Sequence, residues 1–168
     1  MVVRRIRYKQ TMSAHAVQHF LRRAKDFEYS MKLCNESSLR AEVEFPAVGA
    51  NRINESLQSA ALLGIHAAIS YADALRTALG DSDLSAEDHQ KAVGRLRQVL
   101  ADKKVDDLRG VQRFRGIVGR KSTIAYSRNR ISANDLKSIV ESCQRFSVWI
   151  NQIGKQLKVE GWGNVTAE

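Results

Sequence analysis

The residues best suited to chemistry lie in one late stretch of the chain, from Arg109 to Tyr126. Guanidinium groups bind phosphate through paired hydrogen bonds, and a tyrosine such as Tyr126 adds a ring for stacking and a hydroxyl. Because Arg109, Arg113 and Arg120 are four and seven residues apart, they fall roughly on one helix face. The predicted ligand-binding residues, for RNA or a nucleotide, are Arg109, Arg113, Arg115, Arg120, Lys121 and Tyr126. A basic helix face with a tyrosine at its rim is the simpler alternative.

Three glycines interrupt the same stretch, at Gly110, Gly116 and Gly119. Each costs a helix roughly 1 kcal/mol relative to alanine. That cost is easier to explain if another backbone, a phosphate or a bulky side chain comes close to the helix. We therefore expect close approach at these positions, and we expect Arg120 and Tyr126 to converge on one groove.

The histidines offer weaker candidates for catalysis. His66 lies within an apolar helical pattern, where a buried histidine bonded to its surroundings is the simpler interpretation and catalysis the alternative. His15 and His19 are four residues apart but have no third ligand nearby, so no metal site is expected. No phosphate-binding loop, dinucleotide fingerprint or EF-hand spacing is present, so no cofactor is expected.

Composition indicates a globular protein with an anionic partner. The chain has 168 residues, a net charge of +9, one proline and two cysteines. The positive charge is concentrated: residues 1–30 have seven basic and two acidic side chains, and residues 95–130 have eleven and three. Two such blocks favour a partner such as nucleic acid, a nucleotide or an acidic protein surface. With neither a membrane-length apolar run nor a signal-peptide pattern in the sequence, we expect no membrane association and a cytoplasmic location.

Apolar residues at spacings of three and four predict five helices in one all-α domain spanning residues 1–168, most simply an up-and-down bundle. The expected helices cover residues 13–34, 54–79, 85–101, 105–126 and 132–157. The second, which is rich in alanine, is expected to be central. The remaining segments are expected to be a flexible basic N-terminus at 1–12, a long loop at 35–53 and a frayed tail at 159–168.

The order of three motifs resembles the HEPN superfamily of helical bundles over about 100 residues, from Leu57 to Leu157. The alanine-rich stretch Leu62–Leu75, with His66, is similar to the long helix of that family. Asp88–Val93 is similar to the start of the short histidine-bearing helix that follows. Lys121–Tyr126, followed by Ser132 and a long apolar helix, is similar to the late motif of the family.

The resemblance implies a HEPN-like fold that has lost its catalytic histidine. Active members cleave RNA with an arginine followed four to six residues later by a histidine, paired across a homodimer. Arg120 matches the arginine, but no histidine follows His89, and Tyr126 occupies the catalytic position. With a reference pKa near 10, a tyrosine relays protons poorly at neutral pH.

The expected function is therefore a non-catalytic, homodimeric HEPN-like module that binds RNA or a nucleotide. The resemblance further implies a toxin–antitoxin-like system or a nucleotidyltransferase partner protein. One alternative is a metal-independent HEPN-type ribonuclease with an atypical site, for which the catalytic candidates are Arg120, Tyr126 and His66. Another alternative is a helical bundle that serves protein interaction alone.

Overall fold

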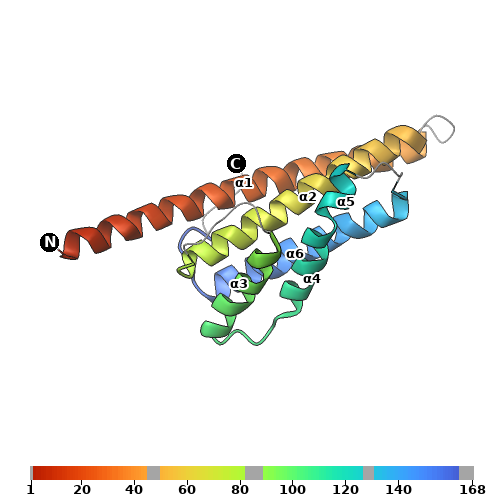
Figure 1. Cartoon of the computed structure of the whole chain (residues 1–168). Helices are drawn as coiled ribbons and strands as arrows, with labels where there is room; N and C mark the ends of the chain where they lie inside the picture. Colours follow the sequence, from red (N-terminus) through yellow and green to blue (C-terminus); the bar gives the residue numbers. More distant parts are fainter. Residues whose placement is uncertain (1, 45–49, 82–88, 127–130, 163–168) are drawn as a thin grey trace.

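The structure, a computed structural model, is an all-α helical bundle, as the sequence predicts (Figure 1). It describes residues 2–44, 50–81, 89–126 and 131–162; for residues 2–13 and 50–52 only the backbone is described. No strand occurs in these ranges. The helices are α1 (Val2–Glu44), α2 (Ala50–Ala78), α3 (His89–Asp102), α4 (Arg109–Gly119), α5 (Lys121–Tyr126) and α6 (Ala133–Gln156).

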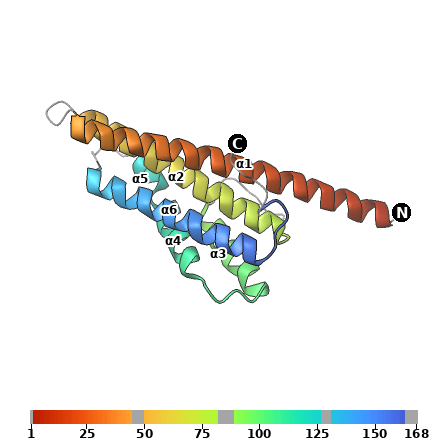
Figure 2. The same ribbon diagram turned by 180° about the vertical axis from the view of Figure 1, so that it is seen from behind.

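A long antiparallel pair, α1 and α2, forms one side of the molecule, and the N-terminal end of α1 extends beyond the other helices (Figures 1 and 2). Helix α1 begins at Val2, earlier than the start expected at residue 13, and the predicted loop at 35–53 is wrong for residues 35–44 and 50–53, which are helical. Residues 2–44 contain neither glycine nor proline, so no helix-breaking residue interrupts α1. Within the helix, the buried Ser38 hydroxyl donates a hydrogen bond to the Asn35 carbonyl oxygen over 2.7 Å.

Helix α2 is the centre of the core, as its alanine-rich sequence predicts. It contacts α1, α3, α4, α5 and α6. Leu57, Ile65 and Leu75 are fully buried, and so are Ala60 and Ala68 on neighbouring faces. Because alanine side chains are small, α1 and α6 can both approach the α2 backbone closely.

The late helices differ from the prediction in two places. The helix expected to begin at residue 105 begins only at Arg109, because residues 105–108 are not helical. The expected helix at 105–126 is divided, because α4 ends at Gly119 and Arg120 caps it before the short α5 begins. By contrast, the last expected helix is confirmed as α6. Ser132 caps its start, where the Ser132 hydroxyl oxygen accepts a hydrogen bond from the Asp135 backbone N–H over 3.1 Å.

The end of the described chain packs against the bundle. Trp162 is buried, its indole N–H donates to the Asn151 side-chain oxygen over 3.0 Å, and its ring lies against Gly154. The prediction of a frayed tail is therefore wrong for residues 159–162, while residues 163–168 lie outside the described part. The first residues of the predicted third helix, 85–88, also lie outside it. None of the helices that the structure describes combines the length and the apolar character that crossing a bilayer requires.

Candidate functional site

Two adjoining pockets lie between α4 and α6, and Arg113 lines both. The first, of about 180 Å³, is lined by Arg113, Gly116, Ile117, Arg120, Ser138, Ile139 and Ser142. The second, of about 230 Å³, is lined by Asp107, Arg109, Arg113, Arg145, Val148, Trp149 and Gln152. We refer to the two pockets together as the α4–α6 groove.

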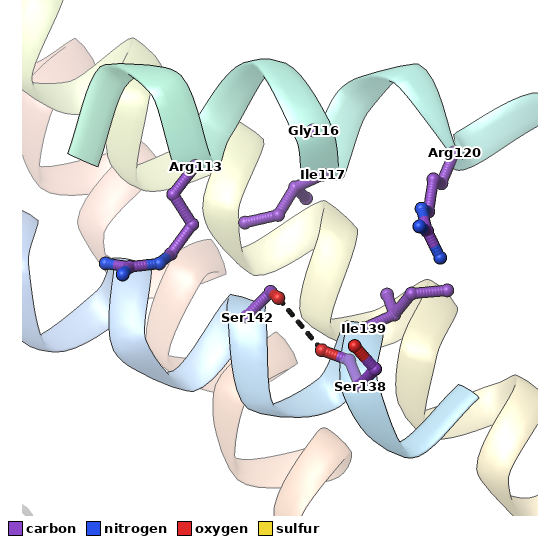
Figure 3. Close-up of a pocket in the computed structure, with 7 residues that line it drawn as sticks. All are labelled: Arg113, Gly116, Ile117, Arg120, Ser138, Ile139 and Ser142. Atoms are coloured by element: carbon purple, nitrogen blue, oxygen red, sulfur yellow. Dashed lines mark hydrogen bonds between the residues drawn. The ribbon is translucent and has the colours of Figure 1, made fainter. Parts of the chain in front are cut away.

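The first pocket combines cationic edges with an apolar floor (Figure 3). Arg113 and Arg120 project from the α4 side toward α6, where Ser138 and Ser142 lie, and Ile117 lies between the two arginines. The Ser142 hydroxyl donates a hydrogen bond to the Ser138 carbonyl oxygen over 2.8 Å. Within the described part of the chain neither Arg113 nor Arg120 forms an ion pair, so both guanidinium groups are available to an anion.

The same pocket contains Gly116, one of the three glycines of this stretch. A Cβ atom added at Gly116 would meet nothing within 4 Å, so the space beside this backbone is open. Gly110 behaves differently, because an added Cβ would overlap the buried ring of Trp149. The close approach expected at Gly110 is thus confirmed, and it comes from a side chain of α6.

The second pocket is more nearly neutral. Arg109 donates two hydrogen bonds to Asp107, from Nε to Oδ1 over 2.9 Å and from Nη2 to Oδ2 over 3.0 Å. These bonds lower the pKa of Asp107 to about 2, so its carboxylate stays ionised and opposes the guanidinium charge. Arg145 forms an exposed ion pair with Glu141 over 3.0 Å. We therefore take the first pocket as the stronger anion site.

Three of the six predicted ligand-binding residues line the α4–α6 groove, and the other three do not. Arg109, Arg113 and Arg120 line the groove, which agrees with their expected common face. Arg115 is exposed and lines neither pocket, and Tyr126, at the end of α5, is 83% exposed and lines neither. The Lys121 Nζ lies 2.8 Å from the His89 Nε2 of α3, and Lys121 lines neither pocket.

His66 lies half-buried on α2, outside the α4–α6 groove. Its ring centroid is 5.4 Å from that of Phe27 on α1. Burial lowers the pKa of His66 below the usual 6.5, and the positive charges of Lys121, His89 and Arg23 lower it further. The imidazole is therefore neutral at pH 7.

Replacing Lys121 is expected to shift the titration of His66. In Lys121→Ala the His66 pKa should rise, because the ammonium charge that opposes protonation is gone, but it should stay below 6.5, because burial is the larger cause. NMR of the imidazole carbon-bound protons between pH 4 and 8 measures both values. An unchanged His66 pKa in the variant would show that Lys121 does not lie near this ring.

The sequence reasoning missed the α6 side of the groove. Ser138 and Ser142 are four residues apart and flank Ile139, which is the spacing of a polar strip beside a buried position. This spacing predicts that Ser138 and Ser142 lie next to each other on one helix. It does not predict that they lie near Arg113, which is on another helix. Among the described residues, no cluster of three or more histidine, cysteine, aspartate or glutamate side chains could hold a metal ion.

Compared with protein-family models, with curated proteins and with solved structures, the chain has no match. Its functional assignment therefore depends on the geometry and charge of the site.

Proposed function

We propose that the α4–α6 groove binds the phosphate groups of RNA or of a nucleotide. The observation that carries this proposal is the first pocket. Two guanidinium groups, which form no ion pair with any described residue, and two serines flank its apolar floor, and none of its described lining residues is a carboxylate. Guanidinium groups match phosphate oxygens in geometry and keep their charge at every physiological pH. The open space at Gly116 lets a phosphate approach the α4 backbone.

The groove favours a ligand with more than one phosphate. Arg109 and Arg120 are eleven residues apart in sequence, which corresponds to roughly 16 Å along a helix axis. Arg113 lies between them and belongs to both pockets. A single-stranded RNA can place successive phosphates along such a row, whereas a mononucleotide occupies one pocket. RNA is accordingly the ligand that we place first.

The proposed activity is binding without cleavage. None of the described residues that line the groove is a histidine, and the neutral His66 lies outside it on α2. Arg120, which matches the arginine of the HEPN motif, lines the first pocket. Tyr126, at the position of the catalytic histidine in that motif, lines neither pocket. A homodimer, a nucleotidyltransferase partner and a toxin–antitoxin-like role belong to the same proposal on the strength of that resemblance.

Removing the two arginines of the first pocket tests the proposal. Arg113→Ala/Arg120→Ala should weaken binding of a fluorescent single-stranded RNA by about 100-fold or more at fixed salt, since charge-assisted hydrogen bonds contribute about 1.5–3 kcal/mol each. Fluorescence anisotropy measures the dissociation constant. Because each phosphate contact on a single strand adds about 0.7 to the slope of log affinity against log salt, the slope should also fall by about 1.4.

The control is Arg97→Ala/Arg115→Ala, which removes the same charge from exposed positions outside the groove. This variant should bind RNA within about threefold of the wild type, because only the long-range attraction changes. If the control loses as much affinity as the groove variant, binding follows net charge and the proposed groove is wrong.

A further inference from the structure

The outer face of α1 has an exposed mixed stripe between Tyr29 and Glu44. Four of its large apolar side chains are exposed: Tyr29 (65%), Leu33 (49%), Leu39 (47%) and Val43 (82%). None of the four belongs to the hydrophobic core or packs against it. Buried positions such as Ala24, Met31 and Ser38 lie on the opposite side of the helix, toward α2. Large exposed apolar side chains that gather on one helix face are typical of interaction surfaces.

A row of alternating charges runs through the middle of this stripe. Lys32, Glu36, Arg40 and Glu44 are each four residues apart, and all four are exposed. Residues four apart form a ridge on a helix surface, and here Tyr29 and Leu33 lie on one side of the ridge, Leu39 and Val43 on the other. In the described part of the chain, Glu36 and Arg40 form no ion pair.

The alternation is self-complementary only when two copies run antiparallel. If a two-fold axis passes at the height of residue 38, Glu36 faces Arg40 of the second copy, and Lys32 faces its Glu44. A parallel pair in register would instead set Lys32 against Lys32 and Glu36 against Glu36. Charges along helix edges select partner and orientation in this way in coiled coils.

We propose that this face of α1 is a homodimer interface, in which two copies pair antiparallel about residue 38. The row has equal numbers of positive and negative side chains, so it fits neither an anionic membrane surface nor a nucleic acid. The contact extends over residues 29–44, roughly 24 Å of helix, which is short for a stable dimer. The dimer is therefore weak, with a dissociation constant on the order of tens of micromolar.

Charge reversal tests the register. Glu36→Lys opposes Arg40 of the second copy, and Arg40→Glu opposes its Glu36, so each single variant should weaken dimerisation by about tenfold or more. The double variant Glu36→Lys/Arg40→Glu should recover wild-type dimerisation, because positions 36 and 40 again present opposite charges to each other across the two-fold axis. An equimolar mixture of the two single variants should form a heterodimer more readily than either variant self-associates. Sedimentation velocity between about 5 and 500 µM covers the expected dissociation constants.

The control is Glu141→Lys, which reverses an exposed charge on α6 and should leave dimerisation unchanged. Circular dichroism confirms that each variant stays folded, as its exposed position predicts. A wild-type chain that is monomeric at about 500 µM, well above the expected dissociation constant, would overturn the proposal. So would dimerisation that neither single reversal weakens, or a double variant that stays as weak as the singles. The interface rests on the homodimer of the proposed function, and because the RNA-binding groove lies on α4 and α6, a failure of dimerisation and a failure of RNA binding are measured separately.

Discussion

Arg76→Leu is expected to lower the free energy of unfolding by about 3–5 kcal/mol, because it leaves buried carboxylates without their cation. The Arg76 side chain, near the end of α2, is 4% exposed. Its Nη2 lies 2.7 Å from Asp81 Oδ2, and its Nη1 lies 3.1 Å from Asp73 Oδ1. Arg95 also pairs with Asp81, over 2.7 Å, and partly compensates the loss. We therefore expect the lower half of the range.

The loss in Arg76→Leu should depend on pH in a defined direction. Burial raises the pKa of Asp73 to about 6, against the lowering effect of Arg76. Without Arg76 the pKa should rise further, and an unpaired carboxyl destabilises the fold only while it is ionised. The deficit should therefore be largest at pH 8 and should shrink as the pH falls toward 5, where the folded variant takes up protons more readily than the unfolded chain.

Urea denaturation followed by circular dichroism at pH 8 and pH 5 measures both deficits. Arg97→Leu is the matched control, because Arg97 is exposed on α3. It should change stability by less than about 0.5 kcal/mol at either pH. Equal deficits for Arg76→Leu at the two pH values would show that the loss comes from packing and not from unpaired charge.

The sequence predicts best those elements whose signals are local. The apolar spacing of α6 is uninterrupted and Ser132 supplies a cap, so the predicted helix agrees with the observed bounds to within a residue. The predicted turn after α1 is too broad. Pro46 and Gly49 are the turn residues of the predicted loop at 35–53. The polar residues Asn35 and Ser38 extended that prediction too far toward the N-terminus, because Ser38 is in fact buried within α1. Contact with α2 stabilises a segment whose own helical signal is weak.

In the candidate site, too, the sequence predicts what depends on local spacing and does not predict what depends on the packing of two helices. The common face of Arg109, Arg113 and Arg120 follows from spacing within one helix, and the structure places all three along the groove. Ser138 and Trp149 complete the groove from α6, and their meeting with α4 depends on how the two helices dock, which no local pattern encodes. The sequence predicts that Tyr126 joins Arg120, but the helix is divided at Arg120, so six residues no longer correspond to a fixed rotation.

Gly110→Ala and Gly116→Ala, two identical substitutions within one helix, are expected to have opposite effects on stability. At Gly110 the added methyl group overlaps the Trp149 ring, which is only 6% exposed and cannot move into solvent. Overpacking of this kind costs about 1–3 kcal/mol. At Gly116 the methyl group meets nothing within 4 Å, so the higher helix propensity of alanine should stabilise the fold by up to about 1 kcal/mol.

The two variants should thus differ by about 1–4 kcal/mol in the free energy of unfolding, measured by urea denaturation. If the loss at Gly110 comes from Trp149, then Trp149→Leu should cost less in the Gly110→Ala background than in the wild type, because the smaller side chain relieves the overlap. Additive costs would show that the two residues do not meet. A gain in stability at both glycines would mean that α4 and α6 lie farther apart than the groove requires.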